Sequence, residues 1–176
     1  MSLAERLSDA SYRFYRLIRH PRASELAEGA PGAEGFDHLE GHRYGLLITY
    51  RRSGEGVPTP VWFGLRDGKV YVHTEPRTAK VRRIRANPKV RFAPCTMRGK
   101  PRGPAAEGRA RILPAEEEVS AEAAIQANYG LGRRVYEQPL TRTSLEWVYL
   151  EISPSAARAQ DANGETNAAP AGAGDR

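Results

Sequence analysis

The stretch "VPTPVWFGLRDGKVYVHT", residues 57–74, carries the clearest structural signal in the chain. It contains two runs rich in β-branched and aromatic residues, 57–65 and 70–74, separated by an Asp-Gly pair. An Asp-Gly pair between such runs is the strongest short signal for a β-hairpin. The first run also holds two prolines, which cannot donate to a β-ladder and therefore favour an edge strand or a bulge. The stretch predicts a hairpin whose first strand lies at a sheet edge.

Similar β-rich runs flank this hairpin, and short turns join most neighbouring runs, so antiparallel pairing is expected. Closure into a barrel is favoured because it removes exposed strand edges. The sequence therefore predicts a mainly β fold with peripheral helices: a six-stranded antiparallel β-barrel. The expected strands are 44–52, 57–65, 70–74, 89–95, 105–113 and 146–153.

The two ends of the chain differ from this central part. Residues 2–19 have apolar residues at helical spacing, and residues 20–41 are rich in Gly, Ala, Pro and Glu, as in a long connection. The last segment contains no aromatic or large aliphatic residue, so it is expected to be disordered. The predicted organisation is an N-terminal helix and linker (1–41), a barrel domain (42–154) and a disordered tail (155–176).

The composition is that of a soluble globular protein, with 40% hydrophobic and 27% charged residues among 176. No run of apolar residues is long enough for a membrane span, and the N-terminus has no signal-peptide pattern, so a cytoplasmic location is expected. The single cysteine excludes an internal disulfide. A net charge of +6 favours anionic partners in general.

Two potential reactive sites are disfavoured by their context. His38 and His42 are four residues apart, but the zinc-peptidase pattern requires Glu directly after the first His, where this chain has Leu39. Two loop histidines and no metal site are therefore expected. Cys95 ends an apolar run, and a buried structural thiol is the favoured interpretation.

The most basic part of the chain has seven Lys or Arg residues between positions 74 and 91. Thr74 is expected to end a strand, and Thr78 and Lys80 to begin a helix. Two hydroxyl groups, an ammonium group and helix N-terminal amides would then converge, which suits a phosphate monoester. The other cations fall on several helix faces, so some are solvated. Nucleic acid is not the expected partner because no recognised binding motif is present.

These residues also resemble a known family. The stretch 57–74, followed by 78–80 ("TAK") and 82–95 ("RRIRANPKVRFAPC"), resembles the pyridoxamine 5′-phosphate oxidase-like split-barrel proteins. The set is most similar to the actinobacterial branch that uses the deazaflavin coenzyme F420, with "EGRARIL" (107–113) and "VYLEISP" (148–154) in the same order. The resemblance covers about residues 40–154 and implies a split β-barrel.

The resemblance also assigns a cofactor site with a part for the phosphate and a part for the tricyclic ring. It comprises Thr59, Pro60, Val61 and Trp62 beside the ring, and Thr74, Thr78, Ala79 and Lys80 around the phosphate. The family usually has Ser at position 78, and Thr keeps the hydroxyl. The vitamin-oxidising members have a basic pair in the ring segment. Its absence here argues against pyridoxamine phosphate oxidation and favours F420 over FMN.

The resemblance thus implies an oxidoreductase that transfers a hydride from reduced F420 to an unidentified small-molecule substrate. An FMN-binding oxidoreductase of the same fold and a non-catalytic cofactor or haem carrier remain alternatives. No catalytic acid or base is assigned; Tyr129 and Tyr136 have suitable side chains, but packing is favoured. The family also implies a homodimer in which residues 89–113 help form the interface and Arg98 or Arg102 reaches the partner's ligand.

Overall fold

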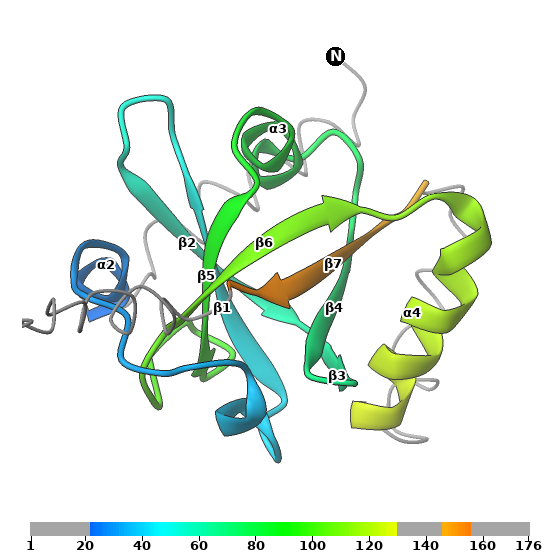
Figure 1. Ribbon diagram of the computed structural model, residues 1–176, viewed down its shortest axis with the longest axis horizontal. Coiled ribbons are helices and arrows are strands. Elements are labelled where there is room, and N and C mark those ends of the chain that lie inside the picture. Colours follow the sequence, from blue (N-terminus) through cyan, green and yellow to red (C-terminus); the bar gives the residue numbers. More distant parts are fainter. Residues whose placement is uncertain (1–21, 130–145, 156–176) are drawn as a thin grey trace, which may run out of the picture.

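The computed structural model describes residues 22–129 and 146–155. One antiparallel sheet curls into a half-barrel, with helices on both sides and over one end (Figure 1), which confirms the predicted mainly β, split-barrel class. The strands are β1 (Tyr44–Tyr50), β2 (Gly56–Trp62), β3 (Gly64–Arg66), β4 (Lys69–Thr74), β5 (Lys89–Cys95), β6 (Ala106–Ile112) and β7 (Val148–Pro154). The helices are α2 (Arg22–Glu28), the 3-10 helix η1 (Asp37–Leu39), α3 (Ala79–Ala86) and α4 (Ala115–Tyr129).

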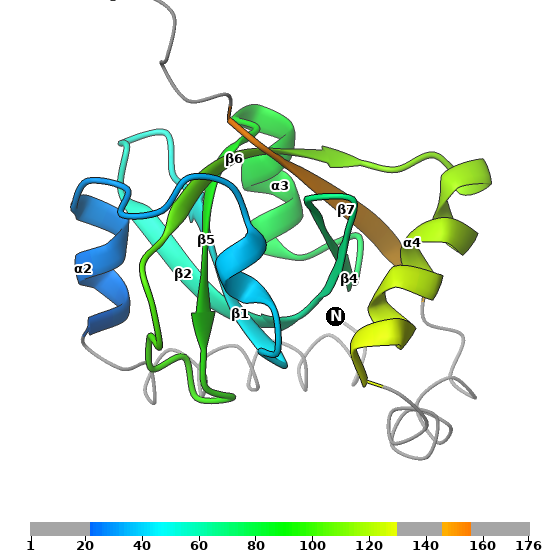
Figure 2. The ribbon, with the colours of Figure 1, turned by 60° about the horizontal axis from the view of Figure 1, so that its bottom comes forward.

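The strands follow the spatial order β2-β1-β5-β6-β7-β4-β3. Helices α2 and α4 flank opposite sides of the sheet (Figure 2). No helix among the described residues is long and apolar enough to span a membrane. The helix expected at 2–19, Tyr136 and residues 156–176 of the expected tail lie outside the described residues.

The hairpin predicted around the Asp-Gly pair is confirmed. Strands β3 and β4 pair through Arg66 and Lys69, and the two residues between them, Asp67 and Gly68, have φ values of 51° and 68°. Positive φ at both central positions is the geometry of the type I′ turn, which matches the natural twist of paired strands. The edge position of the proline-containing strand is also confirmed, because β2 pairs only with β1 and ends the sheet.

The number of strands differs from the expectation: the sheet has seven strands instead of six. The reason is that the run 57–65 is interrupted at Phe63, so that β2 lies at one edge of the sheet and β3 at the other. Because the run is β-rich throughout, its composition does not reveal this break. One stretch of chain therefore supplies both edges of the half-barrel.

Helix α4 holds this bend in place. A side chain at Gly64 would put its Cβ 2.3 Å from the backbone of Ala124, so only glycine lets the helix pack this closely. The Phe63 N–H donates to the Tyr129 hydroxyl at 3.0 Å, and the Asn128 side-chain amide donates to the Phe63 carbonyl at 2.9 Å. Both backbone groups that leave the ladder at the bend are thus satisfied.

The main core fills the inside of the half-barrel, and a second cluster lies between α2 and the outer face of β1 and β5. Side chains on β1 alternate between them: Leu47 belongs to the first, whereas Leu46 and Ile48 belong to the second. A third cluster packs under α4. The largest fully buried side chains include Phe36, Phe63, Phe92, Leu39, Leu46, Leu47, Ile48, Ile125, Leu150 and Ile152.

The segment expected to be only a long connection, 20–41, contains α2 and η1 and contributes to the main core. Phe36 and Leu39 are each 1% exposed, and the Phe36 ring meets Phe92 edge to face, with centroids 6.4 Å apart. The high Gly, Ala and Pro content of the segment is typical of a connection, so the burial of Phe36 and Leu39 was not predicted. Burial of one aromatic and one leucine side chain contributes several kcal/mol, roughly 1.5–3 each.

Arg91 fixes the end of α2 to the sheet. Its guanidinium donates to the carbonyls of Leu26 and Ala27, both at 3.2 Å, and pairs with Glu107 at 3.1 Å. These carbonyls lie at the end of α2, where helical carbonyls have no intrahelical partner. One cation of the basic stretch is therefore structural.

Candidate functional site

The residues predicted to bind a phosphate lie where β4 gives way to α3. Thr74 is the last residue of β4, and Lys80 lies in the first turn of α3. The Lys80 ammonium donates to the Thr74 hydroxyl at 2.7 Å. Lys80 is 7% exposed and Thr74 is 5% exposed, which is unusual for these residue types. The structure thus brings together two of the predicted residues in a buried pair.

A second pair of the same kind, missed by sequence reasoning, comes from α3 and β1. The Arg83 side chain donates through Nε to the hydroxyl of Thr49, which is fully buried, at 2.7 Å. We name Thr49, Thr74, Lys80 and Arg83 the donor cluster. The spacing of three residues between Lys80 and Arg83 indicates one helix face and could have singled out Arg83. Thr49 is 34 residues from Arg83, and no local pattern points to it.

The electrostatics of the donor cluster favour an anion. Burial lowers the pKa of Lys80 from 10.5 to about 8, the positive charge of Arg83 acts in the same direction, and Glu75 opposes both effects. The two cations therefore repel one another in a poorly solvated place. A phosphate among them would supply the missing negative charge, and hydroxyl groups and cations are the groups that bind phosphate oxygens. The donor set fits a phosphate group.

The other two residues of the predicted phosphate site occupy less direct positions. The Thr78 hydroxyl donates to the Glu75 carbonyl at 3.0 Å instead of capping α3. Ala79 is the first residue of α3 and offers only its backbone. Thr78 therefore stabilises the turn that precedes Lys80. Its hydroxyl is already hydrogen-bonded to the Glu75 carbonyl.

The predicted ring segment lies on the edge strand β2, and its side chains alternate between two faces. Val61 belongs to the main core, so Thr59 lies on that same inner face, and Pro60 and Trp62 lie on the outer face. The Trp62 ring stacks on Tyr129, with centroids 4.8 Å apart at 20°. The four side chains therefore do not form one surface. Their common feature is that they all lie on an edge strand.

Tyr129 has a structural role that its residue type did not reveal. Its hydroxyl donates to the Arg43 carbonyl and accepts the Phe63 N–H. The proton that a catalytic tyrosine would deliver is thus held by a backbone carbonyl. These contacts support the packing interpretation of Tyr129.

Cys95 and the histidine pair add no reactive group to the site. Cys95 is 3% exposed, and burial raises the pKa of its thiol to about 12, so the structural interpretation is confirmed. His38 lies in η1, and burial lowers its pKa. Within 22–129 and 146–155, no group of three or more residues could hold a metal ion.

The comparisons with known proteins agree with this architecture. A family model described as pyridoxamine 5′-phosphate oxidase matches residues 33–158. The chain therefore belongs to the pyridoxamine 5′-phosphate oxidase family. A search of curated proteins found no match.

Three solved structures illustrate the shared fold. A protein of unknown function from Agrobacterium tumefaciens has 17% identity and a TM-score of 0.53 over 72% of this chain and 57% of that one. A conserved hypothetical protein from Mycobacterium tuberculosis has 20% identity and a TM-score of 0.50 over 72% and 86%. A protein from Bacteroides thetaiotaomicron assigned to 5-nitroimidazole antibiotic resistance has 15% identity and a TM-score of 0.50 over 65% and 74%. At these identities the likeness establishes the fold alone.

Proposed function

We propose that this protein is an oxidoreductase that uses coenzyme F420 and reduces a small molecule. The observation that carries the proposal is the buried contact between Lys80 and Thr74, reinforced by Arg83 and Thr49. Burying the Lys80 ammonium near the part-buried Arg83 costs free energy, and a bound phosphate offsets that cost. Membership of the pyridoxamine 5′-phosphate oxidase family supports a phosphate-bearing redox cofactor at this position.

The protein's own part in such a reaction is binding and orientation. Lys80 and Arg83 would hold the phosphate, and the hydroxyls of Thr74 and Thr49 would fix its position. When bound, the reduced cofactor supplies the hydride. The edge of β2 offers backbone groups to a flat ring, and the buried surroundings of the donor cluster exclude water. No side chain is assigned as catalytic acid or base.

The choice of F420 over FMN rests on the ring segment. Positions 59–62 hold Thr, Pro, Val and Trp, without the basic pair of the vitamin-oxidising relatives. FMN remains the alternative because two cations and two hydroxyls also suit the dianion of a phosphate monoester. A haem or cofactor carrier without turnover is the other alternative.

A direct titration tests this proposal. Purified protein is titrated with F420 and with FMN under identical conditions, following cofactor fluorescence, and then supplied with reduced F420 and a panel of electrophilic acceptors. We expect tighter binding of F420 and acceptor-dependent oxidation of the reduced form. Tighter binding of FMN would overturn the cofactor assignment. Binding of F420 without turnover of any acceptor would favour the carrier.

We also propose that the protein acts in the cytosol as a homodimer, with residues 89–113 near the interface. A single buried thiol suits a reducing compartment. Sedimentation at low micromolar concentration should give twice the chain mass of 19.4 kDa. A monomer that binds the cofactor with full affinity would contradict the dimer.

A further inference from the structure

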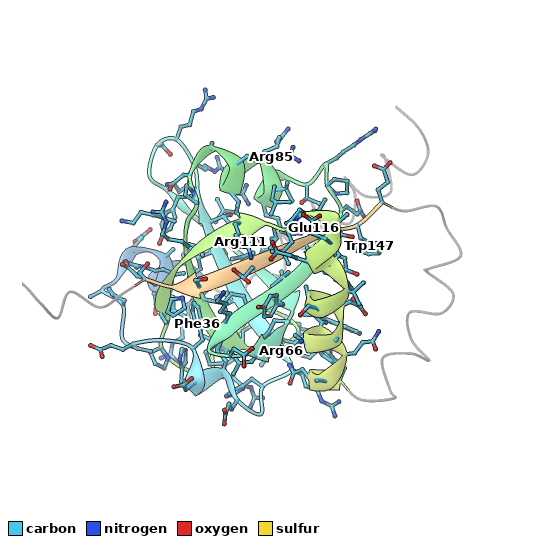
Figure 3. The ribbon with its side chains drawn as sticks, turned by 45° about the vertical axis from the view of Figure 1, so that its right-hand side comes forward. Phe36, Arg66, Arg85, Arg111, Glu116 and Trp147 are labelled. Carbon is cyan, nitrogen blue, oxygen red and sulfur yellow. The ribbon has the colours of Figure 1, made fainter. Side chains whose placement is uncertain are left out.

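Four side chains on the outer face of the sheet, beside α4, form a cluster that takes no part in the donor cluster. His73 comes from β4, Glu122 from α4 and Tyr149 from β7, and Trp147 directly precedes β7. We name these four residues the His73 cluster. Trp147 lies on the α4 side of the sheet in Figure 3.

The members of the His73 cluster are joined by polar and ring contacts. The His73 Nδ1 atom lies 3.8 Å from Glu122 Oε2, and the Tyr149 hydroxyl donates to the same oxygen at 3.0 Å. The His73 ring stacks on the Trp147 indole, with centroids 4.8 Å apart at 25°, and meets the Tyr149 ring edge to face at 6.0 Å and 61°. The side chains of His73 and Glu122 are 13% and 27% exposed, so solvent screens their interaction only in part.

The His73 cluster lies across the sheet from the donor cluster. Val72 belongs to the main core, whereas Tyr71 belongs to the third cluster, under α4. Since successive residues of a strand face opposite sides, Thr74 faces the inside with Val72, and His73 faces α4 with Tyr71. His73 and Thr74 are the last two residues of β4. Contacts that hold His73 therefore also fix the backbone from which the Thr74 hydroxyl projects.

Helix α4 joins this strand end to the bend in the sheet. Near its C-terminus, Asn128 and Tyr129 bond to the backbone of Phe63 at the bend. Its middle turn carries Glu122, which faces His73. The pair of His73 and Glu122 thus ties the end of β4 to the same helix that holds the bend.

Only a protonated His73 can form an ion pair with Glu122. Histidine is the side chain that ordinarily changes its charge between about pH 5 and pH 8. Among the described residues, the titratable groups in contact with His73 are Glu122 of α4 and Tyr149 of β7. The carboxylate and the face of the Trp147 indole both attract a cation, and the neutral Tyr149 ring does not repel one. The tie is therefore present in acid and is lost as the pH rises through the histidine range.

We propose that His73 and Glu122 form a pH-dependent clamp between α4 and the end of β4, and that this clamp positions Thr74 for the phosphate. His73 is a positioning residue, because its side chain lies on the face opposite the donor cluster. The positioning role rests on the proposed function, whereas the clamp itself rests on contacts of the free protein. Ligand binding should therefore be tighter where His73 is protonated.

The Trp147 indole reports the charge of His73, because a protonated imidazole stacked on an indole quenches its fluorescence. The emission of Trp147, taken as the difference between the native protein and Trp147→Phe, should fall from about pH 8 to about pH 5.5. Glu122→Gln keeps an oxygen for Tyr149 but removes the charge, so it should move the midpoint of this fall to lower pH. Glu118→Gln, one helical turn earlier, removes the same charge and should move it much less. A constant emission, or equal shifts in the two variants, would overturn the clamp.

Binding measurements test the positioning role. F420 is titrated by fluorescence at about pH 6 and about pH 8, and inorganic phosphate is compared through its effect on the thermal midpoint. Glu122→Gln should weaken both ligands roughly threefold at the lower pH, with little change at the higher pH, and Glu118→Gln should bind normally at both. Unchanged binding by Glu122→Gln at the lower pH would overturn the positioning role.

The two ligands separate this inference from the proposed function. If phosphate shows the expected pattern and F420 does not bind, the cofactor assignment fails and the clamp stands. If F420 binds with the same affinity to Glu122→Gln and to the native protein at the lower pH, the cofactor assignment stands and the positioning role fails. If neither ligand binds to the native protein, both fail.

Discussion

Helix α3 has two cationic faces with opposite surroundings. On the face toward the sheet, Lys80 is buried against Thr74, and Arg83 donates to Thr49. On the other face, Arg82 and Arg85 are exposed and make no ion pair within the described residues; Arg85 lies on the outer side of the helix in Figure 3. Basic side chains on one helix are thus hydrogen-bonded to threonines on the inner face and exposed to solvent on the outer face.

This difference shows that a dense basic stretch need not be a single binding surface. Solvent and salt screen the outer cations, so each contributes little to binding a ligand. Lys80 is buried, Arg83 is part-buried, and hydroxyl groups position both, so an anion gains more from each of them. Four experiments test this contrast.

The largest effect is expected for Lys80→Ala. A hydrogen bond to a charged group contributes about 1.5–3 kcal/mol, and each 1.4 kcal/mol is tenfold in affinity, so cofactor binding should weaken about ten- to a hundredfold. Fluorescence titration of F420 at low and high salt measures this. Arg85→Ala is the control, with a small effect that salt removes. Similar losses in both variants would refute the special role of the inner face.

A somewhat smaller effect is expected for Arg83→Met, which keeps much of the side chain's length but removes its charge. Loss of one charge-assisted contact should weaken cofactor binding about tenfold. Arg82→Met, one position earlier on the exposed face, is the matched control and should bind normally. If the two variants behave alike, Arg83 serves only to hold Thr49.

The pKa of Lys80 predicts a pH dependence. In the folded protein it is lowered to about 8, so above pH 8 the free site loses its proton. Affinity for the cofactor should therefore fall roughly five- to tenfold from pH 8 to pH 9, with proton uptake on binding. Calorimetry in two buffers of different ionisation enthalpy measures that uptake. Lys80→Ala should abolish the dependence, and a flat profile in the native protein would contradict it.

The same pKa shift affects stability with a defined sign. The pKa of Lys80 in the folded protein lies below the unfolded value of 10.5. The destabilisation caused by burying its ammonium group is therefore at its full size at pH values under about 8. This penalty is relieved as the pH rises from about 8 to 10.5. The contribution of Lys80 to the free energy of unfolding thus increases over that window.

The smallest effect is expected for Thr78→Val. The Thr78 hydroxyl donates a hydrogen bond to the Glu75 carbonyl, so removing it should loosen the turn before α3 and weaken cofactor binding less than about threefold. The titration used for Lys80→Ala checks this. A loss as large as that of Lys80→Ala would show that the hydroxyl turns toward the ligand.

Local signals in the sequence were enough for much of the fold. The Asp-Gly pair specified its turn because few residues accept positive φ, and the prolines of β2 specified an edge because they lack a donor. The break at Phe63 and the anchoring of Phe36 were not foreseen. Both depend on contacts with distant segments, such as α4 and β5, which leave no periodicity in the local sequence.

Local signals in the sequence also predicted part of the candidate site. Thr74 and Lys80 are six residues apart, and the order of strand, turn and helix brings them together. Thr49 could not be found in this way, because only the pairing of β1 with β5 places it near α3. The alternation of side chains on β2 could have been predicted, since successive residues of a strand face opposite sides.

The bend at Phe63 has a consequence for how the chain folds. Its backbone groups are satisfied by Asn128 and Tyr129, which are 65 and 66 residues away in sequence. Closing so long a loop costs entropy before its contacts form, and such non-local contacts slow folding. The β3–β4 hairpin can form early from its own turn, whereas the join between the two edges of the half-barrel waits for α4. We therefore expect closure of the half-barrel to be a late step, with the edge of β3 open to pairing with other chains until α4 packs.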